Sequence, residues 1–462
     1  MSNFDYIVLF SLFIGNLFVG LFFVGKIKTF DYFASGGRSF GAFAIFATLS
    51  ASFMGGGYTL GNAEKVFNHG MIYAFALLGF SLKEILVGYF IAPKIEKYKS
   101  CISIGEIIGK SYGKNSRIFT GIFSVLICLG ILAAQIGAMG YLIQTLFDIE
   151  IYYGAIISLF FILLYCILGG MKSVVYTDIF QFLLLFIAMP IIFFIGMDHV
   201  GGWNNIVNSV PKSFTNPFII ENFWIIFIPL FLTFMFGEAF VPPYVQRLLM
   251  SKDLSKTKNA TIWSGIISIP FFLMIGALGL IALVIDPSIN GNQSIPFLAK
   301  FLLSDGFKGL VFSGLIAIVV SSASSFLNSA SISFVNDVVK PIYDKNEIKD
   351  SKLLIIARIG TAIIGIGSVL FSLLFSNVMD ILVNAYNFWS PLILIPFVSV
   401  VLGKAGTKQQ FWTSCIFSLI CMITIEIFPI EQYNIPTVVI GVIASLIGYI
   451  ITPLILSSNK IK

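Results

Sequence analysis

A run of hydroxyl side chains lies inside a long apolar stretch of this chain, "IAIVVSSASSFLNSASISFVND". Ser321, Ser325 and Ser329 recur at every fourth residue, so a helix would place them along one face. Further polar side chains widen this face into a band: Ser322, Ser324, Asn328, Ser331 and Ser333. Serine hydroxyls in an apolar helix either donate to a carbonyl of the preceding turn or offer their oxygens to a ligand. For most of these serines the pattern favours the first interpretation.

Three consecutive glycines interrupt another apolar stretch, "FMGGGYTLGNAEKVF". Gly55, Gly56 and Gly57 each cost a helix about 1 kcal/mol relative to alanine, so the backbone is expected to unwind there. Close packing against another helix is the alternative explanation. A second stretch, "FWIIFIPLFLTFMFGEAFVPPYVQRLL", is interrupted at a matching depth by Gly237 and Glu238 and then by two prolines. Paired interrupted helices indicate a transporter whose unwound carbonyls hold a cation or a substrate.

Three ionisable residues fall inside apolar stretches. Glu238 lies at the second predicted break, where a charge is costly, so a functional role is the default hypothesis. It is expected to bind a cationic substrate, to take up a proton, or to pair with Lys83. Lys83 and Glu84 are sequence neighbours and diverge by about 100° on a helix. We therefore expect them to form ion pairs with other helices facing the bundle interior, and not with each other.

The composition predicts an all-α integral membrane protein. The chain is 58% hydrophobic and 11% charged, with a mean hydropathy of +0.97, whereas soluble domains carry roughly 25% charged residues. About thirteen apolar runs are long enough to cross a bilayer as helices. They lie near residues 4–26, 41–66, 72–95, 116–147, 151–169, 175–197, 223–246, 259–286, 306–338, 352–376, 378–403, 408–428 and 435–457.

The spacing of the two interrupted spans predicts how the single transmembrane domain, residues 1–462, is organised. They are the second and the seventh span, an offset of five, so each would begin a five-helix repeat, and an odd repeat length makes the second repeat inverted. The first repeat is expected at 41–197 and the second at 223–403. An extra N-terminal helix would occupy 4–26, and two C-terminal helices 408–457.

Lys and Arg fall mainly on alternate loops, one of which is taken to contain Arg247. The positive-inside rule therefore places the N-terminus outside and the C-terminus in the cytoplasm of a bacterial-type inner (plasma) membrane. This bias accounts for the net charge of +6 without any nucleic-acid partner. The longest hydrophilic segments, 198–222 and 287–305, are expected to be loops. Neither a catalytic constellation nor a cofactor-binding loop is visible in the sequence, which argues against an enzyme.

Several motifs together resemble the sodium:solute symporter family, which has the leucine-transporter-like fold. They are the glycine stretch, "SIGEIIGKSYGKNSR", "GGMKSVVYTDIFQ", "VQRLLMSKD" and "SSASSFLNSASISFVND". The glycine stretch with "GNAEKVF" is most similar to the high-affinity choline transporter branch. The resemblance implies one Na⁺ between the break of helix two and helix nine. Its implied ligands are the carbonyls of Ala51, Met54 and Ile318 and the hydroxyls of Ser321 and Ser322.

The resemblance also implies a route for the ion and a place for the substrate. Asp178 of the "TD" motif would lie near the exit route of the ion. The choline branch encloses its ligand in an aromatic cage, of which Phe53 and Phe80 keep two positions. Ile131 and Val241 stand where that branch has cage tryptophans, with Phe240 next to the second. The expected substrate-cavity residues are Phe53, Tyr58, Phe80, Gln135, Glu238, Phe240, Asn384 and Asn387.

The predicted function is therefore sodium-coupled import of a small organic solute by alternating access. Its partners are Na⁺, the solute and the lipid bilayer, and Na⁺ is the coupling ion with no further cofactor. A proton-coupled permease of the same fold, with Glu238 as the proton carrier, is the first alternative. A passive channel is the second.

Overall fold

The structure is a computed structural model that describes residues 1–23, 27–343, 348–373, 378–387, 389–428 and 436–458. The described residues form helices and no strands, apart from one isolated bridge between Phe40 and Ser251. The predicted all-α fold is confirmed. Parts of the predicted spans, at 24–26, 374–376, 388 and 435, lie outside the described residues.

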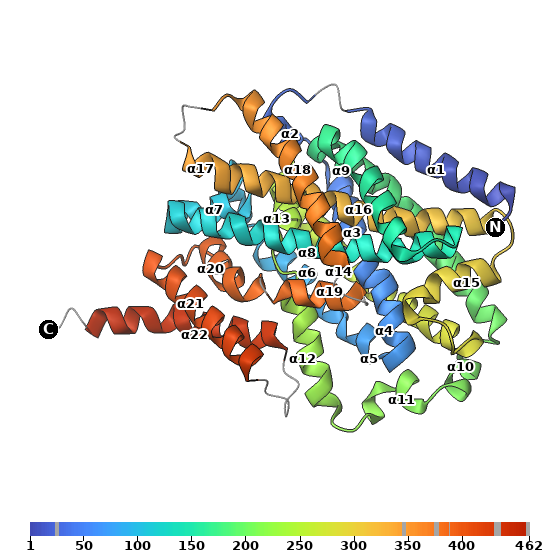
Figure 1. The fold of residues 1–462 in the computed structure, drawn as a ribbon. Helices are drawn as coiled ribbons and strands as arrows, with labels where there is room; N and C mark the ends of the chain where they lie inside the picture. Colours follow the sequence, from blue (N-terminus) through green and yellow to red (C-terminus); the bar gives the residue numbers. More distant parts are fainter. Residues whose placement is uncertain (24–26, 344–347, 374–377, 388, 429–435, 459–462) are drawn as a thin grey trace.

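The α-helices follow one another along the chain with short connections (Figure 1). Their bounds are α1 Asn3–Leu21, α2 Phe30–Ser35, α3 Ala42–Phe53, α4 Asn62–His69, α5 Ile72–Ala76, α6 Leu78–Phe90, α7 Ile104–Tyr112, α8 Lys114–Phe147, α9 Ile151–His199, α10 Trp203–Ser209, α11 Lys212–Thr215, α12 Phe223–Phe236, α13 Pro242–Leu249, α14 Leu254–Ile285, α15 Ser294–Leu302, α16 Phe307–Ser333, α17 Lys340–Ile342, α18 Asp350–Ser372, α19 Val378–Tyr386, α20 Ser390–Val401, α21 Lys408–Ile427 and α22 Thr437–Ser458. Two π-helices lie between them: η2, Gly57–Gly61, precedes α4, and η6, Phe334–Val339, connects α16 to α17.

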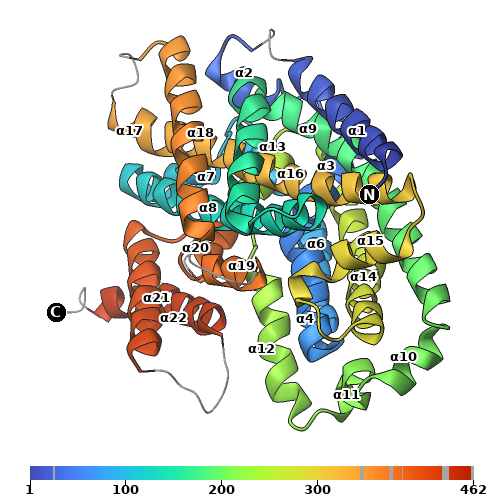
Figure 2. The same ribbon diagram turned by 45° about the vertical axis from the view of Figure 1, so that its right-hand side comes forward.

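Helix α16, which carries the serine band, forms the centre of the bundle. All its residues from Ala317 to Ser333 are buried, and α3, α8, α9, α13 and α18 pack around it. Both ribbon views place α21 and α22 together at one flank and α1 at the opposite flank (Figure 2). Small side chains let neighbouring helices approach α16 closely, so its serines contact several elements at once.

Seven helices in the described part of the chain are long and apolar enough to cross a membrane, or up to nine if each of two bent pairs counts as one span. The predicted count of thirteen stays a prediction. Three apolar helices fall short because they are only 10–17 residues long: Ile151–Leu164, Phe223–Phe236 and Thr437–Pro453. The predicted spans 151–169 and 175–197 both lie within α9 and are divided by a kink at Gly170, whose φ of 54° and ψ of −164° are not helical.

Both predicted helix breaks are present. The axis bends by 56° between α3 and the segment Gly57–His69, and α12 and α13 are separated by residues 237–241. A third bend, of 54° between α19 and α20, divides a span predicted to be continuous. The predicted loops 198–222 and 287–305 were wrong in part, because they contain α10, α11 and α15. Figure 2 shows α10 and α11 lying across one end of the bundle.

Candidate functional site

The break in the second predicted span is formed by Met54, Gly55 and Gly56, between α3 and η2. Gly56 donates its backbone N–H to Oε1 of Gln135 on α8, at 2.7 Å. A Cβ on Gly55 would collide with the Ser322 hydroxyl, and one on Gly56 would lie 2.7 Å from the Cβ of Ala138. The glycines are therefore required by the close approach of α8 and α16 as well as by the unwinding.

Of the two adjacent serines of α16, Ser322 contacts the end of α3 beside this break and Ser321 contacts α9. The Ser322 hydroxyl donates to the carbonyl oxygen of Ser52 at 2.6 Å, in the last turn of α3. The Ser321 hydroxyl donates to Oδ1 of Asp178 on α9 at 2.5 Å. Both serines are fully buried. Ser324 donates back to the carbonyl of Ser321, whereas Ser329 donates to Oε1 of Gln246 on α13 and Ser331 to the carbonyl of Ala357 on α18. The expectation that most serines of the band would bond to their own helix was therefore wrong.

The predicted sodium ligands belong to two segments that contact each other through Ser322 and Ser52. Ala51 and Met54 belong to the end of α3 and to the break, and Ile318 lies one helical turn before Ser322 on α16. All are buried. The Met54 carbonyl already accepts a hydrogen bond from the Thr59 hydroxyl at 2.8 Å, which leaves one lone pair for a ligand. Carbonyl and hydroxyl oxygens are suitable donors for a hard cation, so this set fits Na⁺ and stays a prediction.

A buried ion pair lies beside the serine pair. Nη2 of Arg247 is 3.1 Å from Oδ2 of Asp178, and both side chains are fully buried. Arg247 also donates to the hydroxyls of Thr48 at 2.9 Å and Ser52 at 2.7 Å, and to that of Ser325. Asp178 in turn accepts from the Thr48 and Ser321 hydroxyls. This network, called the arginine network below, joins α3, α9, α13 and α16.

The assignment of Arg247 to a basic loop was wrong. It belongs to α13, which starts after the second break and carries the guanidinium into the bundle, where five hydrogen-bond acceptors surround it. Thr48 and Ser52 also had no predicted role. Their spacing of four residues on α3 places both hydroxyls on one face, and this was the signal that could have found them.

The second break is closed by side chains from α20 and the residue before it. α12 ends at Phe236, Phe240 takes a left-handed φ of 55°, and Pro242 occupies the first turn of α13. The Ser390 hydroxyl donates to the carbonyl of Gly237 at 2.9 Å, and the Trp389 indole N–H donates to that of Ala239 at 2.9 Å. The carbonyls of Gly237 and Ala239 therefore already accept hydrogen bonds from the protein. The sequence had instead predicted that the carbonyls at both breaks would be free to hold a cation or a substrate.

A cluster of aromatic and charged side chains lies between the two breaks. The ammonium Nζ of Lys83 is 4.0 Å from the ring centroid of Phe80, 4.8 Å from that of Tyr244 and 5.6 Å from that of Phe53. The same nitrogen is 2.7 Å from Oε1 of Glu84. The expectation that Lys83 and Glu84 would not pair was wrong. Although their Cβ atoms diverge, both side chains are long enough to bend together, and burial disfavours leaving either charge unpaired.

Glu238 belongs to the same cluster. Its side chain is buried, and Tyr58 and Tyr386 lie beside it with their hydroxyls 2.6 Å apart in a mutual hydrogen bond. Lys83 pairs with Glu84 and not with Glu238, which has no ion-pair partner within 4.0 Å among the described residues. The Tyr58 ring also packs edge-on against Phe80. The cluster thus contains Phe53, Tyr58, Phe80 and Glu238 of the predicted cavity.

The remaining cavity residues lie around this cluster or away from it. Gln135 is buried at the first break, and Phe240 packs its ring 4.9 Å from Phe397. Asn384 is exposed and donates to the Asp380 carbonyl of its own helix, at 2.8 Å. Asn387 is half-buried. Both asparagines stay predictions. Tyr244 and Tyr386, which the sequence analysis did not name, contribute to the cluster from α13 and α19.

Comparisons with known proteins show the family and the fold of this chain. The sodium:solute symporter family profile matches residues 32–416. The "High-affinity choline transporter 1" of Drosophila melanogaster is 25% identical over 374 residues, covering 77% of this chain, which spans only 58% of that protein. The "Sodium/sialic acid symporter" of Aliivibrio fischeri is 24% identical over 479 residues, covering 97% of this chain and 93% of the relative.

A solved structure has the same fold over nearly the whole chain. The substrate-bound, outward-open structure of a Na⁺-coupled sialic acid symporter superposes with a TM-score of 0.83 at 21% identity, covering 98% of both chains. At this level of identity the likeness establishes the fold.

Proposed function

Because the chain belongs to the sodium:solute symporter family, we propose that it is a secondary active transporter that couples inward movement of Na⁺ to import of a small organic solute. The observation that carries this proposal is the contact of the Ser322 hydroxyl with the Ser52 carbonyl at the broken helix, beside the Ser321–Asp178 contact. It places buried oxygens from two helices around one point.

The proposed sodium site uses the carbonyls of Ala51, Met54 and Ile318 and the hydroxyls of Ser321 and Ser322. Asp178 lies directly next to it and would attract the departing ion. One charge moving inward through about 100 mV releases about 2.3 kcal/mol, which is enough to concentrate a neutral solute roughly fiftyfold. The burial of both the serine pair and the aromatic cluster fits a transporter in which access alternates between the two sides.

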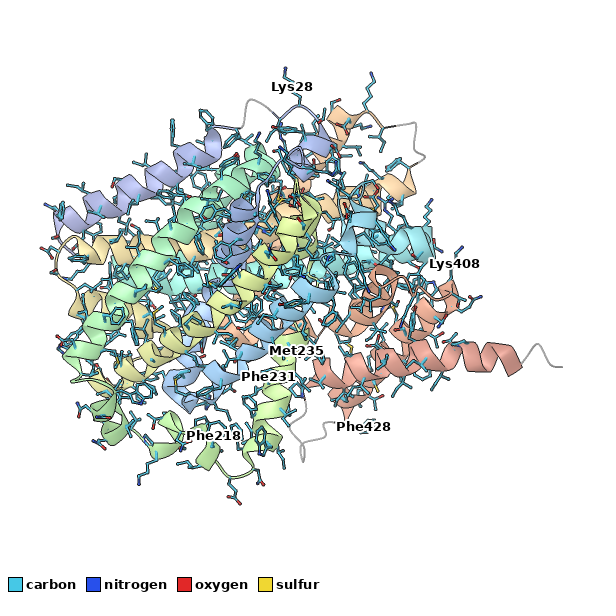
Figure 3. All side chains as sticks on the ribbon, turned by 180° about the vertical axis from the view of Figure 1, so that it is seen from behind. Lys28, Phe218, Phe231, Met235, Lys408 and Phe428 are labelled. Atoms are coloured by element: carbon cyan, nitrogen blue, oxygen red, sulfur yellow. The ribbon has the colours of Figure 1, made fainter. Side chains whose placement is uncertain are left out.

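The proposed orientation has the N-terminus outside and the C-terminus in the cytoplasm. Figure 3 shows Lys28 and Lys408 projecting from the end of the bundle that carries α7 and α17, whereas Phe218 lies at the opposite end. A basic end on the cytoplasmic side follows the positive-inside rule.

Replacement of either serine tests the sodium site. In Ser321→Ala and Ser322→Ala, we expect the Na⁺ concentration for half-maximal thermal stabilisation of the purified protein to rise roughly tenfold or more, since each variant loses an oxygen ligand. Ser313→Ala is the matched control, because its hydroxyl lies on the same helix and donates to its own helical carbonyl, Gly309. An unchanged Na⁺ response in both serine variants would reject this site.

A proton-coupled permease of the same fold is the second candidate, and the buried Glu238 carboxyl favours it. Solute uptake into proteoliposomes in sodium-free buffer, between about pH 5.5 and 8, separates the candidates. We expect uptake to fall to background at every pH in the absence of Na⁺. Uptake that continues at full rate and disappears in Glu238→Gln would instead establish proton coupling.

A further inference from the structure

The geometry points to a substrate that carries a protonated amine with N–H donors, held by the carboxylate of Glu238. This inference rests on the proposed transport function and names the class of solute that the aromatic cluster would accept. It is carried by three observations: an aromatic cage filled by the chain's own lysine, a charge balance that leaves one carboxylate over, and the surroundings of that carboxylate.

The aromatic cage already contains a cation. Phe80, Tyr244 and Phe53 face the Lys83 ammonium with centroid distances of 4.0, 4.8 and 5.6 Å. Stabilisation of a cation by ring faces depends on close approach within about 6 Å. A quaternary ammonium would therefore have to displace a tethered ammonium from the same ring faces. The cluster is consequently a poor site for a quaternary ammonium, although it is rich in aromatic side chains.

The charges of the cluster do not balance. Lys83 and Glu84 neutralise each other at 2.7 Å. The other fully buried ion pair near the breaks, Arg247 with Asp178, is likewise closed on itself. Glu238 is the remaining carboxyl of the cluster, and no basic group lies within 4.0 Å of it in the described part of the chain, so Lys83 acts on it only from a greater distance. A solute with one positive charge would restore neutrality, whereas an anionic solute would add a second uncompensated negative charge.

The surroundings of Glu238 select a cation that can donate hydrogen bonds. Its Oε2 is buried and has no hydrogen-bond partner among the described residues. The hydroxyl pair of Tyr58 and Tyr386 lies beside it and offers further oxygen acceptors. A primary or secondary ammonium can donate to these oxygens through charge-assisted hydrogen bonds, but a trimethylated nitrogen has no N–H. Neutral alcohols donate hydrogen bonds but leave the charge uncompensated.

The test compares matched solutes on the same carbon skeleton. Thermal unfolding of the purified full-length protein is measured in Na⁺ and in K⁺ with three sets of probes: ethanolamine, choline and ethylene glycol; 4-aminobutyrate, its trimethylated form and 4-hydroxybutyrate; and phenethylamine, its trimethylated form and phenethyl alcohol. We expect at least one amine to stabilise the protein in Na⁺ at a roughly tenfold lower concentration than its two counterparts. Glu238→Gln should lose this preference while keeping its response to Na⁺.

Two further variants complete the design. Glu64→Gln is the control, because Glu64 is equally buried but contacts Lys65 and Asn68 away from the cluster, and it should keep the amine preference. The double variant Lys83→Ala/Glu84→Gln empties the cage without leaving Glu84 as a lone charge, so it should gain a response to the quaternary probes.

Each contrary result has a defined meaning. Trimethylated or hydroxyl probes that match the amines, or an unchanged amine preference in Glu238→Gln, would overturn the inference. A parent protein stabilised by Na⁺ but by none of the amines would overturn the substrate class and leave the proposed function intact. A parent protein that does not respond to Na⁺ would instead count against the proposed function itself.

Discussion

Arg247→Met is expected to lower the free energy of unfolding by about 3–5 kcal/mol and to abolish transport. The guanidinium is fully buried and 3.1 Å from Asp178, so its removal leaves a buried carboxylate without its counter-charge. It also removes the hydrogen bonds to Thr48 and Ser52, which tie α13 to α3. Because Ser52 supplies the carbonyl that Ser322 contacts, loss of the arginine network should disturb the proposed sodium site as well. Thermal unfolding and solute uptake measure the two effects.

A second substitution separates the charge from the packing. The double variant Asp178→Asn/Arg247→Met no longer contains a lone buried charge. Its loss in free energy of unfolding should therefore be smaller than the sum of the losses in the two single variants. Transport should not recover, because the proposed ion route then lacks the Asp178 carboxylate. Arg38→Met is the control: Arg38 is partly exposed and 3.9 Å from Asp31, and such pairs contribute about 1 kcal/mol or less. A stable, active Arg247→Met protein would show that the arginine network is dispensable.

The two helix breaks could be predicted from the sequence because their cause is local. Three successive glycines weaken a helix wherever they occur, and the Gly237–Glu238 interruption is followed at once by two prolines. The contact of Ser322 with the helix end at the first break was also anticipated, through the resemblance of the motifs. In both cases the signal lies in a few consecutive residues, and the membrane restricts what an unwound segment can do.

The arginine network could not be predicted because its members are far apart in sequence. Asp178 and Arg247 are separated by 69 positions, and nothing local distinguishes a buried arginine at the end of a helix from one that belongs to a basic loop. The Lys83–Glu84 pair was missed for a different reason. Helical geometry fixes where the Cβ atoms point, but flexible side chains can still meet when no other partner is available in an apolar interior.

The two breaks also differ in a way that the sequence did not indicate. At the second break the carbonyls of Gly237 and Ala239 are occupied by Ser390 and Trp389, from the bend between α19 and α20. At the first break the Ser322 hydroxyl donates to the carbonyl of Ser52. A hydroxyl that donates one hydrogen bond keeps its oxygen lone pairs, which can bind an ion. We therefore propose that the ion binds at the first break, where carbonyls and the Ser322 hydroxyl lie together, and that the second break positions Glu238 for the solute.

Gly55→Ala is expected to abolish sodium-dependent stabilisation and transport, although alanine favours a helix by about 1 kcal/mol. The added Cβ would collide with the Ser322 hydroxyl and would also lie 2.8 Å from the Ser322 Cβ and 3.0 Å from Oε1 of Gln135. Relief of this contact must move α16 away from the break or turn the Ser322 side chain, and either change separates the proposed ligands. Overpacking of this kind destabilises a protein by about 1–3 kcal/mol, so folded protein should remain for measurement.

Gly137→Ala is the matched control for this prediction, because Gly137 lies in the interior of α8 and a Cβ there would have only an ordinary contact, 3.5 Å from Ile381. Since its backbone is helical, this variant should be slightly more stable than the parent and equally responsive to Na⁺. Both variants therefore add one methyl group to a glycine, but Gly55→Ala should lose the response to Na⁺ and Gly137→Ala should keep it. If Gly55→Ala binds Na⁺ as Gly137→Ala does, the glycines serve only to pack helices, and the ion must be held elsewhere.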